Sequence, residues 1–238
     1  MRCNGWDTLP VGMIEMFTWS LALAIGFAFL DWASTWKGWK IRLYVSKPAT
    51  LFFLILWTFQ LTGWEGGMIW FGIALLFSLA GVIALMLNSR FFLIALFAFL
   101  LAHVAYLIGF DQQLPPLTLG PIILFLLVTL SAVRVFKTLK PGVLRVPRGK
   151  RFLISVAVYG LTLALMVLSA LVTSFRPDWS LPAAGLVSVG AVLFYISDTL
   201  LGYDRFVRKV KHGQSYVHLT YHIGQFCLVT GAILHFAH

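Results

Sequence analysis

Charged side chains are scarce in this chain of 238 residues. Asp, Glu, Lys and Arg together make up 11% of the sequence, whereas a soluble domain usually has about 25%. Hydrophobic residues make up 60%, and the mean hydropathy is +0.91. One ordinary water-exposed globule could not bury this much apolar sequence, so the composition excludes a soluble fold and indicates a lipid environment.

Cysteine and N-terminal targeting signals are scarce as well. The chain has two cysteines, too few and too differently placed for a disulfide framework. No signal peptide is evident, because Arg2 is followed by Asp7 and no small-residue cleavage site closes a short apolar stretch. We expect residues 1–12 to form a leader and residues 13–238 to form a single membrane domain.

Eight apolar stretches approach the roughly 20 residues that an α-helix needs to cross a bilayer. A β-barrel would alternate apolar and polar residues, whereas runs such as Phe91–Ala102 are apolar on every side, which favours helices. The connections are mostly short, so sequential helices should lie antiparallel in one bundle. The longest connection, Lys137–Arg151, contains Pro141, Gly142 and Pro147, which predict a break in any helix there. The predicted helices are Met13–Leu30, Pro48–Leu61, Met68–Leu87, Phe91–Phe110, Leu117–Phe136, Phe152–Ser174, Pro182–Gly202 and Ser215–Phe236.

The basic residues are unevenly distributed among the connections. Sixteen of the eighteen lie in or beside four connections on one side, and only Arg2 and Arg176 lie on the other. Short loops rich in Lys and Arg remain cytoplasmic. The sequence therefore predicts an all-α integral membrane protein with eight transmembrane helices and both termini extracytoplasmic, placed in a bacterial cytoplasmic membrane.

The formal charge of +10 raises the question of nucleic acid as a partner. The placement of the charge in four loops is better explained by attraction to anionic lipid headgroups. We therefore expect membrane lipids, and no nucleic acid, as partners; the oligomeric state is left open.

Asp198 is the main ionisable residue within a predicted membrane helix. It lies about four residues, or roughly 6 Å, from the cytoplasmic end of that helix. Ionisable residues inside a membrane are costly and mark candidate functional sites. The apolar neighbours disfavour the charged carboxylate, so Asp198 can donate and accept a proton near neutral pH. The alternative is that Asp198 pairs with a loop cation such as Arg205 or caps a neighbouring helix.

The last predicted helix carries a polar stripe at a similar depth. His218, Tyr221 or His222, and Gln225 share one face. They are interpreted in two ways: as groups that orient a substrate or water beside Asp198, or as hydrogen bonds between helices.

Polar residues of three other helices are also candidates. His103 and Tyr106 lie near mid-membrane, where a lone histidine is more often a packing residue. Lys47 either extends to the membrane interface or holds a lipid phosphate. Ser78 is expected to allow close helix packing and is also a candidate substrate contact.

A metal site is a further alternative. His218 and His222 have the i, i+4 spacing that can place two ligands on one ion, and Asp198 could be a third. No Glu lies between the two histidines, and no other membrane histidine is an obvious partner. We therefore expect no metal and no other cofactor.

Several short motifs, in their order and spacing, are similar to those of one family. The chain resembles the lysoplasmalogenase-like (YhhN-type) family of small membrane proteins over most of its length. The pieces that carry the resemblance are Lys47-Pro48, Phe77-Ser78-Leu79-Ala80-Gly81, Phe97-Ala98-Phe99, Ala102-His103-Val104-Ala105-Tyr106, Ser197-Asp198-Thr199-Leu200-Leu201, Arg205-Phe206, Tyr221 and Gln225.

The resemblance implies hydrolysis of the vinyl ether bond of lysoplasmalogens. The products are a fatty aldehyde and a glycerophospho-ethanolamine or -choline, and the lysophospholipid is the expected partner. Asp198 is the implied catalytic acid and base; the implied substrate contacts are Lys47, Ser78, His103, Tyr106, Ser197, Tyr221 and Gln225. The alternative is a non-catalytic lipid-binding or regulatory protein with the same fold.

The chain departs from the family pattern at one position. The helix-three motif usually continues Ser-x-x-Gly-Asp, but Val82 follows Gly81 here. Loss of a positioned acid or base typically costs about 10²–10⁴ in rate. Of the other acidic residues, Asp31, Asp111 and Asp204 are predicted to lie at or beyond the membrane boundaries, which makes them poor replacements. The histidines His103 and His222 are better placed.

Overall fold

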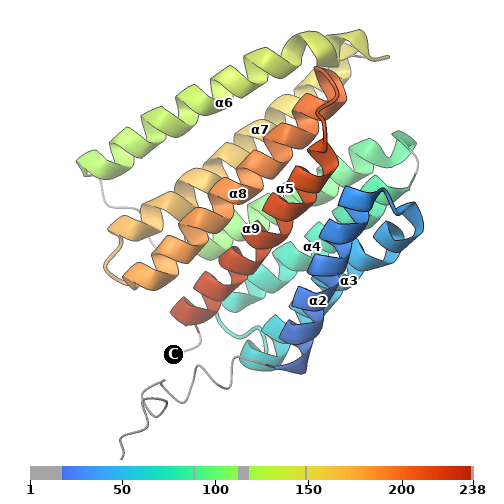
Figure 1. Cartoon of the computed structure of the whole chain (residues 1–238). Coiled ribbons are helices and arrows are strands. Elements are labelled where there is room, and N and C mark those ends of the chain that lie inside the picture. Colours follow the sequence, from blue (N-terminus) through green and yellow to red (C-terminus); the bar gives the residue numbers. More distant parts are fainter. Residues whose placement is uncertain (1–17, 88, 112–117, 148, 237–238) are drawn as a thin grey trace, which may run out of the picture.

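A computed structural model describes residues 18–87, 89–111, 118–147 and 149–236. Within these ranges the regular structure is helical, so the predicted all-α fold is confirmed (Figure 1). The predicted leader, residues 1–12, lies outside them. The eight described α-helices are α2 (Trp19–Lys37), α3 (Lys40–Thr62), α4 (Met68–Met86), α5 (Phe92–Phe110), α6 (Leu119–Arg145), α7 (Gly149–Val172), α8 (Leu181–Phe206) and α9 (Gly213–Phe236). Two short 3-10 helices, η1 (Ser89–Phe91) and η2 (Thr173–Phe175), complete the described elements.

Six of the helices, α4 to α9, are long and apolar enough to cross a membrane. The more polar helices α2 and α3 carry Asp31 and Lys47 at buried positions. The integral membrane character is therefore confirmed, and a crossing by α2 and α3 remains a prediction.

Helix α2 extends further than its sequence pattern predicts. Its expected end was Leu30, but the helix continues to Lys37 and ends at Gly38, whose φ of 71° is accessible to glycine at little cost. Asp31 therefore lies inside a helix and is completely buried. The predicted end of this helix at Leu30 is wrong.

Helix α6 also continues beyond its predicted end at Phe136. It passes through Pro141, which removes one backbone donor, and ends at Arg145. At Gly142 the backbone packs so closely on α8 that a Cβ atom would lie 1.7 Å from the carbonyl oxygen of Phe206. This contact supports the helix where a break was predicted.

The tightest packing joins α8 and α9. A Cβ atom on Gly190 would lie 2.8 Å from the Gly224 carbonyl oxygen, and one on Gly224 would lie 3.0 Å from the Gly190 carbonyl oxygen. Small residues of this kind let membrane helices approach backbone to backbone. Helix α9 also packs on α2, α3 and α4, so it is the central helix of the bundle.

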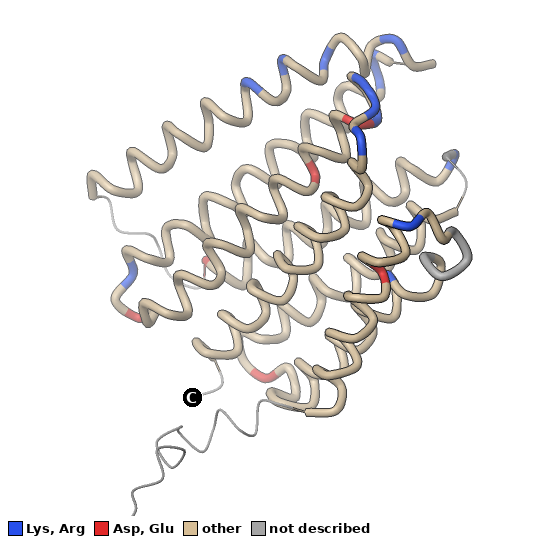
Figure 2. The backbone as a smooth tube through the Cα atoms, viewed as in Figure 1, with Lys and Arg blue, Asp and Glu red and all other residues tan. Residues whose placement is uncertain are grey.

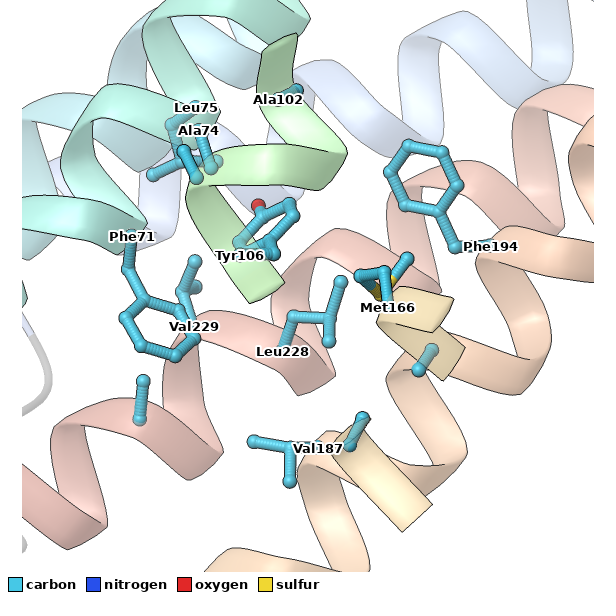
Figure 3. Close-up of a cluster of buried hydrophobic side chains, with 14 of the residues drawn as sticks. Phe71, Ala74, Leu75, Ala102, Tyr106, Met166, Val187, Phe194, Leu228 and Val229 are labelled. Atoms are coloured by element: carbon cyan, nitrogen blue, oxygen red, sulfur yellow. The ribbon is translucent and has the colours of Figure 1, made fainter. Parts of the chain in front are cut away.

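Side chains from several helices fill the core around α9 (Figure 3). The labelled residues come from α4, α5, α7, α8 and α9: Phe71, Ala74, Leu75, Ala102, Tyr106, Met166, Val187, Phe194, Leu228 and Val229. Helix α6 lies at the edge, packed on α7 and α8, and its most apolar segment has no buried residue.

Charge divides the bundle into two ends. Figure 2 shows Lys and Arg gathered mainly at the end where α6 finishes and α7 begins. The two ends of the described chain, at the start of α2 and the finish of α9, lie at the opposite end (Figure 1). The charge asymmetry expected from the sequence is therefore present in the fold.

We expect Gly190→Leu to disrupt the α8–α9 contact, because its side chain would collide with the backbone of α9. The matched control is Gly185→Leu on the same helix, where a Cβ atom meets nothing within 4 Å. Thermal unfolding in detergent should show a large loss of stability for Gly190→Leu alone. Equal stability of the two variants would contradict this packing.

Candidate functional site

A buried carboxylate on α2 organises one half of the candidate site. The Asp31 side chain has no solvent exposure. Its Oδ1 accepts a hydrogen bond from Ser46 Oγ at 2.9 Å, and its Oδ2 lies 2.7 Å from His218 Nδ1. His222 Nδ1 lies 3.8 Å from the same Oδ2. Residues of α2, α3 and α9 thus meet at one buried charge.

Lys47 extends this group toward the interior. Its Nζ lies 3.2 Å from His218 Nε2. Because a lysine ammonium only donates, Nε2 accepts, and the His218 proton belongs on Nδ1, facing Asp31. The Lys47 ammonium also lies 5.5 Å from the Tyr221 ring centroid and interacts electrostatically with both Asp31 and Asp198. We call Asp31, Ser46, Lys47 and His218 the polar cluster.

Asp198 forms a second centre nearby. Its Oδ2 accepts a hydrogen bond from the Tyr159 hydroxyl of α7 and lies 3.9 Å from His103 Nε2 of α5. Neither ring nitrogen of His103 has a hydrogen-bond partner within the described ranges. The alternative partner Arg205 instead places its guanidinium 3.7 Å from the Phe92 ring centroid. The Asp198 carboxyl remains 11% exposed and faces open space.

Three adjoining cavities connect the two centres. The first, of about 410 Å³, we call the cationic cavity; its polar lining is Tyr44, Lys47, Arg205, Gln214 and His218. A junction cavity of about 70 Å³ shares Leu85 and Leu201 with it and includes Asp198 and Tyr159. An apolar cavity of about 290 Å³, beneath α6, shares Asp198, Tyr159, Leu139 and Val156 with the junction. Asp198 therefore lies between a cationic space and an apolar one.

The polar stripe of α9 divides between two groups rather than meeting Asp198 as a unit. His218 and His222 face Asp31. Gln225 accepts from the Tyr106 hydroxyl at 2.5 Å and donates to Ser78 Oγ at 3.1 Å, so these three residues form a bridge between helices.

Two other predicted residues have clear positions. Ser197 donates to the Val217 carbonyl at 3.0 Å and joins α8 to α9. Tyr221 is buried, and its ring lies 5.3 Å from that of Phe194 and beneath the Lys47 ammonium. Lys47 lines the cationic cavity, while His103 lies beside Asp198 and Tyr221 lies beside Lys47. Ser78, Tyr106, Ser197 and Gln225 serve mainly to hold the helices together.

The metal alternative had Asp198 as the third ligand beside His218 and His222. The structure places Asp31 there instead. Across the part of the chain that the structure describes, no group of three His, Cys, Asp or Glu residues is placed to hold a metal ion.

Val82 of α4 is completely buried in the apolar core of the bundle. A valine at that position supplies no carboxyl. Asp111 pairs with Arg176 and Asp204 pairs with Lys209, both at the ends of the bundle, as expected. Asp31 is different, because it provides a second buried carboxyl inside the bundle. It lies there because α2 continues beyond its predicted end at Leu30.

Most of the chain matches one family of proteins in sequence. A sequence model of the YhhN family matches residues 43–232, most of the chain. The chain belongs to the YhhN family. Comparison with curated proteins and with solved structures found no match. The matched range contains Lys47, Asp198 and His218 but begins after Asp31, so the family resemblance alone could not have pointed to that carboxylate.

We expect Asp31→Ala to destabilise the bundle by about 3–5 kcal/mol, because it removes one of the two carboxylates that compensate the buried Lys47 ammonium. The double variant Asp31→Ala/Lys47→Met should recover part of this loss, since removing both charges leaves neither one isolated. The free energy of unfolding in mixed micelles measures both. Strictly additive losses would show that the two residues do not interact. Asp178→Ala, at the rim of the bundle, is the control.

Proposed function

We propose that this YhhN-family protein is a membrane-embedded hydrolase that cleaves the vinyl ether bond of lysoplasmalogens. The observation that carries the proposal is the position of Asp198, a carboxyl between a cationic cavity and an apolar one. An amphiphile with an anionic head and one long chain matches that division, and its ether bond lies between its two parts.

The cavities give a substrate pose. The phosphate would occupy the cationic cavity, where Lys47 and Arg205 supply positive charge and Gln214 supplies hydrogen-bonding groups. The chain would lie in the apolar cavity beneath α6. The vinyl ether then falls in the junction, beside Asp198. One apolar cavity of about 290 Å³ favours a lipid with a single chain.

Asp198 is assigned the first proton transfer. Protonated Asp198 donates to the vinyl carbon that is not bonded to oxygen, and the adjacent carbon becomes an oxocarbenium ion. The Asp198 carboxylate left behind stabilises that cation. The hydroxyl of Tyr159 holds the carboxyl in place, and His103 lies 3.9 Å away as a possible route for the proton that restores the acid.

His218 is assigned the activation of water. Asp31 accepts from His218 Nδ1, an arrangement that orients the ring and stabilises its protonated form. In the present structure Nε2 is held by Lys47. A phosphate in the cationic cavity would draw the ammonium toward itself and free Nε2 to take a proton from water as it adds to the oxocarbenium carbon. The resulting hemiacetal collapses to a fatty aldehyde and the glycerophospho alcohol.

The same proposal includes the membrane arrangement. All eight helices cross, with the basic end cytoplasmic and both termini extracytoplasmic. The support is the pairing of α2 and α3 with the membrane helices α9 and α4 and the concentration of Lys and Arg at one end. The cationic cavity would then open near the cytoplasmic leaflet.

The direct test is fatty aldehyde release from lysoplasmenylethanolamine by the purified chain. We expect the wild type, with Val82 unchanged, to turn over, because His218 and Asp31 supply the activation of water. Asp198→Asn should lower kcat by about 10²–10⁴ through loss of the proton donor, while Asp178→Asn leaves it unchanged. Stoichiometric lipid binding without turnover, in native mass spectrometry and the same assay, would instead support a non-catalytic lipid-binding protein.

A further inference from the structure

A separate cavity lies near the end of the bundle opposite the basic loops. It has a volume of about 320 Å³ and is formed by α5, α6, α7 and the segment that follows α7. Most of its lining is apolar: Leu107, Pro121, Phe125, Leu165, Leu168 and Val172. We call it the outer cavity. Its size is at the low end of small-molecule sites and matches one alkyl chain better than two.

The outer cavity does not belong to the site around Asp198. It shares no lining residue with the cationic, junction or apolar cavities. Between it and the apolar cavity, α6 closes onto the bundle, where Val128 packs against the core and the Ser131 and Tyr195 hydroxyls lie 3.1 Å apart. A chain bound at Asp198 would therefore have to displace this contact to reach it.

Two residues in the wall of the outer cavity each have an unused hydrogen-bond donor. Arg176 is buried; its Nη1 donates to the Phe110 carbonyl and its Nη2 donates to Asp111. Its Nε has no partner among the residues that the structure describes, and the same holds for Ser169 Oγ, which is 94% buried (6% exposed). An unsatisfied buried polar group carries a free-energy cost in the folded state. A ligand that accepts hydrogen bonds would remove that cost.

We propose that the outer cavity binds an amphiphile with one alkyl chain and a neutral oxygen acceptor, such as an aldehyde, an alcohol or an ester carbonyl. The apolar lining takes the chain; Arg176 Nε and Ser169 Oγ, which have almost no accessible surface in this structure, turn toward the oxygen and donate to it. The head is neutral because Asp111 already compensates the Arg176 charge. The Asp111 side chain is 37% exposed and lines the same cavity, so it repels a carboxylate or phosphate.

Photo-crosslinking of the full chain in detergent tests the ligand class. A diazirine-bearing hexadecanol and the matching hexadecanoic acid are compared at about pH 9, where the acid is ionised. We expect the alcohol to label peptides of α6 and α7 around Phe125 and Leu168, and unlabelled hexadecanol to compete. Ser169→Ala should weaken this labelling about three- to tenfold through loss of one hydrogen bond.

Two further variants control the experiment. Thr162→Ala on the same helix removes an exposed hydroxyl that bonds its own backbone, and labelling should not change. Leu168→Trp should fill the cavity and abolish labelling. Preferential labelling by the acid, or equal labelling of Ser169→Ala and Thr162→Ala, would overturn the proposal.

Native mass spectrometry of the purified chain distinguishes the sources of a bound amphiphile. An aldehyde present in the wild type and missing in Asp198→Asn would identify a product of the proposed reaction. An alcohol or ester present in both would identify a membrane lipid. Either result supports the site when Leu168→Trp loses the bound amphiphile, and retention by Leu168→Trp would place it elsewhere and contradict the site. Labelling by hexadecanol does not depend on turnover, so the two proposals can fail separately.

Discussion

The hydrogen bonding of the buried Asp31 carboxylate by the side chains around it is the constraint on which the arrangement of the bundle depends. A fully buried carboxylate in an apolar interior is tolerated only when hydrogen bonds and opposite charge compensate it. Ser46 and His218 supply the hydrogen bonds, and Lys47 supplies the charge. Since these residues belong to α2, α3 and α9, the relative depth and rotation of the three helices are fixed together. A shift of one turn in any of them would leave a buried charge without its partner.

The same contact determines where the cavities lie. Helix α9 is the central helix, and its close glycine packing on α8 fixes Asp198 relative to His218. Lys47 interacts with both carboxylates, so the cationic cavity and the Asp198 junction become parts of one electrostatic unit. Helix α6 lies at the edge of the bundle, and the apolar cavity lies beneath it. A hydrogen-bonded polar interior beside an apolar cavity suits the proposed enzyme, whose substrate would arrive from the bilayer.

Much of this could be predicted from the sequence, because apolar run length and loop charge act locally. The helical fold, the basic end and the isolation of Asp198 among apolar neighbours all follow from such local patterns. The position of Asp31 does not, because it depends on how far α2 continues beyond its apolar run, and a three-helix contact stabilises that extension. Likewise, α6 passes Pro141 because Gly142 packs on the end of α8, a tertiary contact with no local signal. The α9 stripe divides between Asp31, which its histidines face, and Tyr106 and Ser78, which Gln225 bonds, and predicting this requires the rotation of the helix. That rotation is visible only in the packed bundle.

In the proposed reaction the polar cluster and Asp198 act on one substrate, and Lys47 of the cluster holds its headgroup. The most direct measurement compares kcat/KM for lysoplasmenylethanolamine and for the corresponding 1-alkenylglycerol, which has the same vinyl ether but no phosphate. We expect the wild type to prefer the phosphorylated substrate and Lys47→Met to reduce this preference by about tenfold or more, because a charge-assisted contact contributes roughly 1.5–3 kcal/mol. Any loss of stability in Lys47→Met lowers turnover of both substrates alike, so the ratio isolates the phosphate contact. An unchanged preference in Lys47→Met would show that Lys47 does not hold the phosphate.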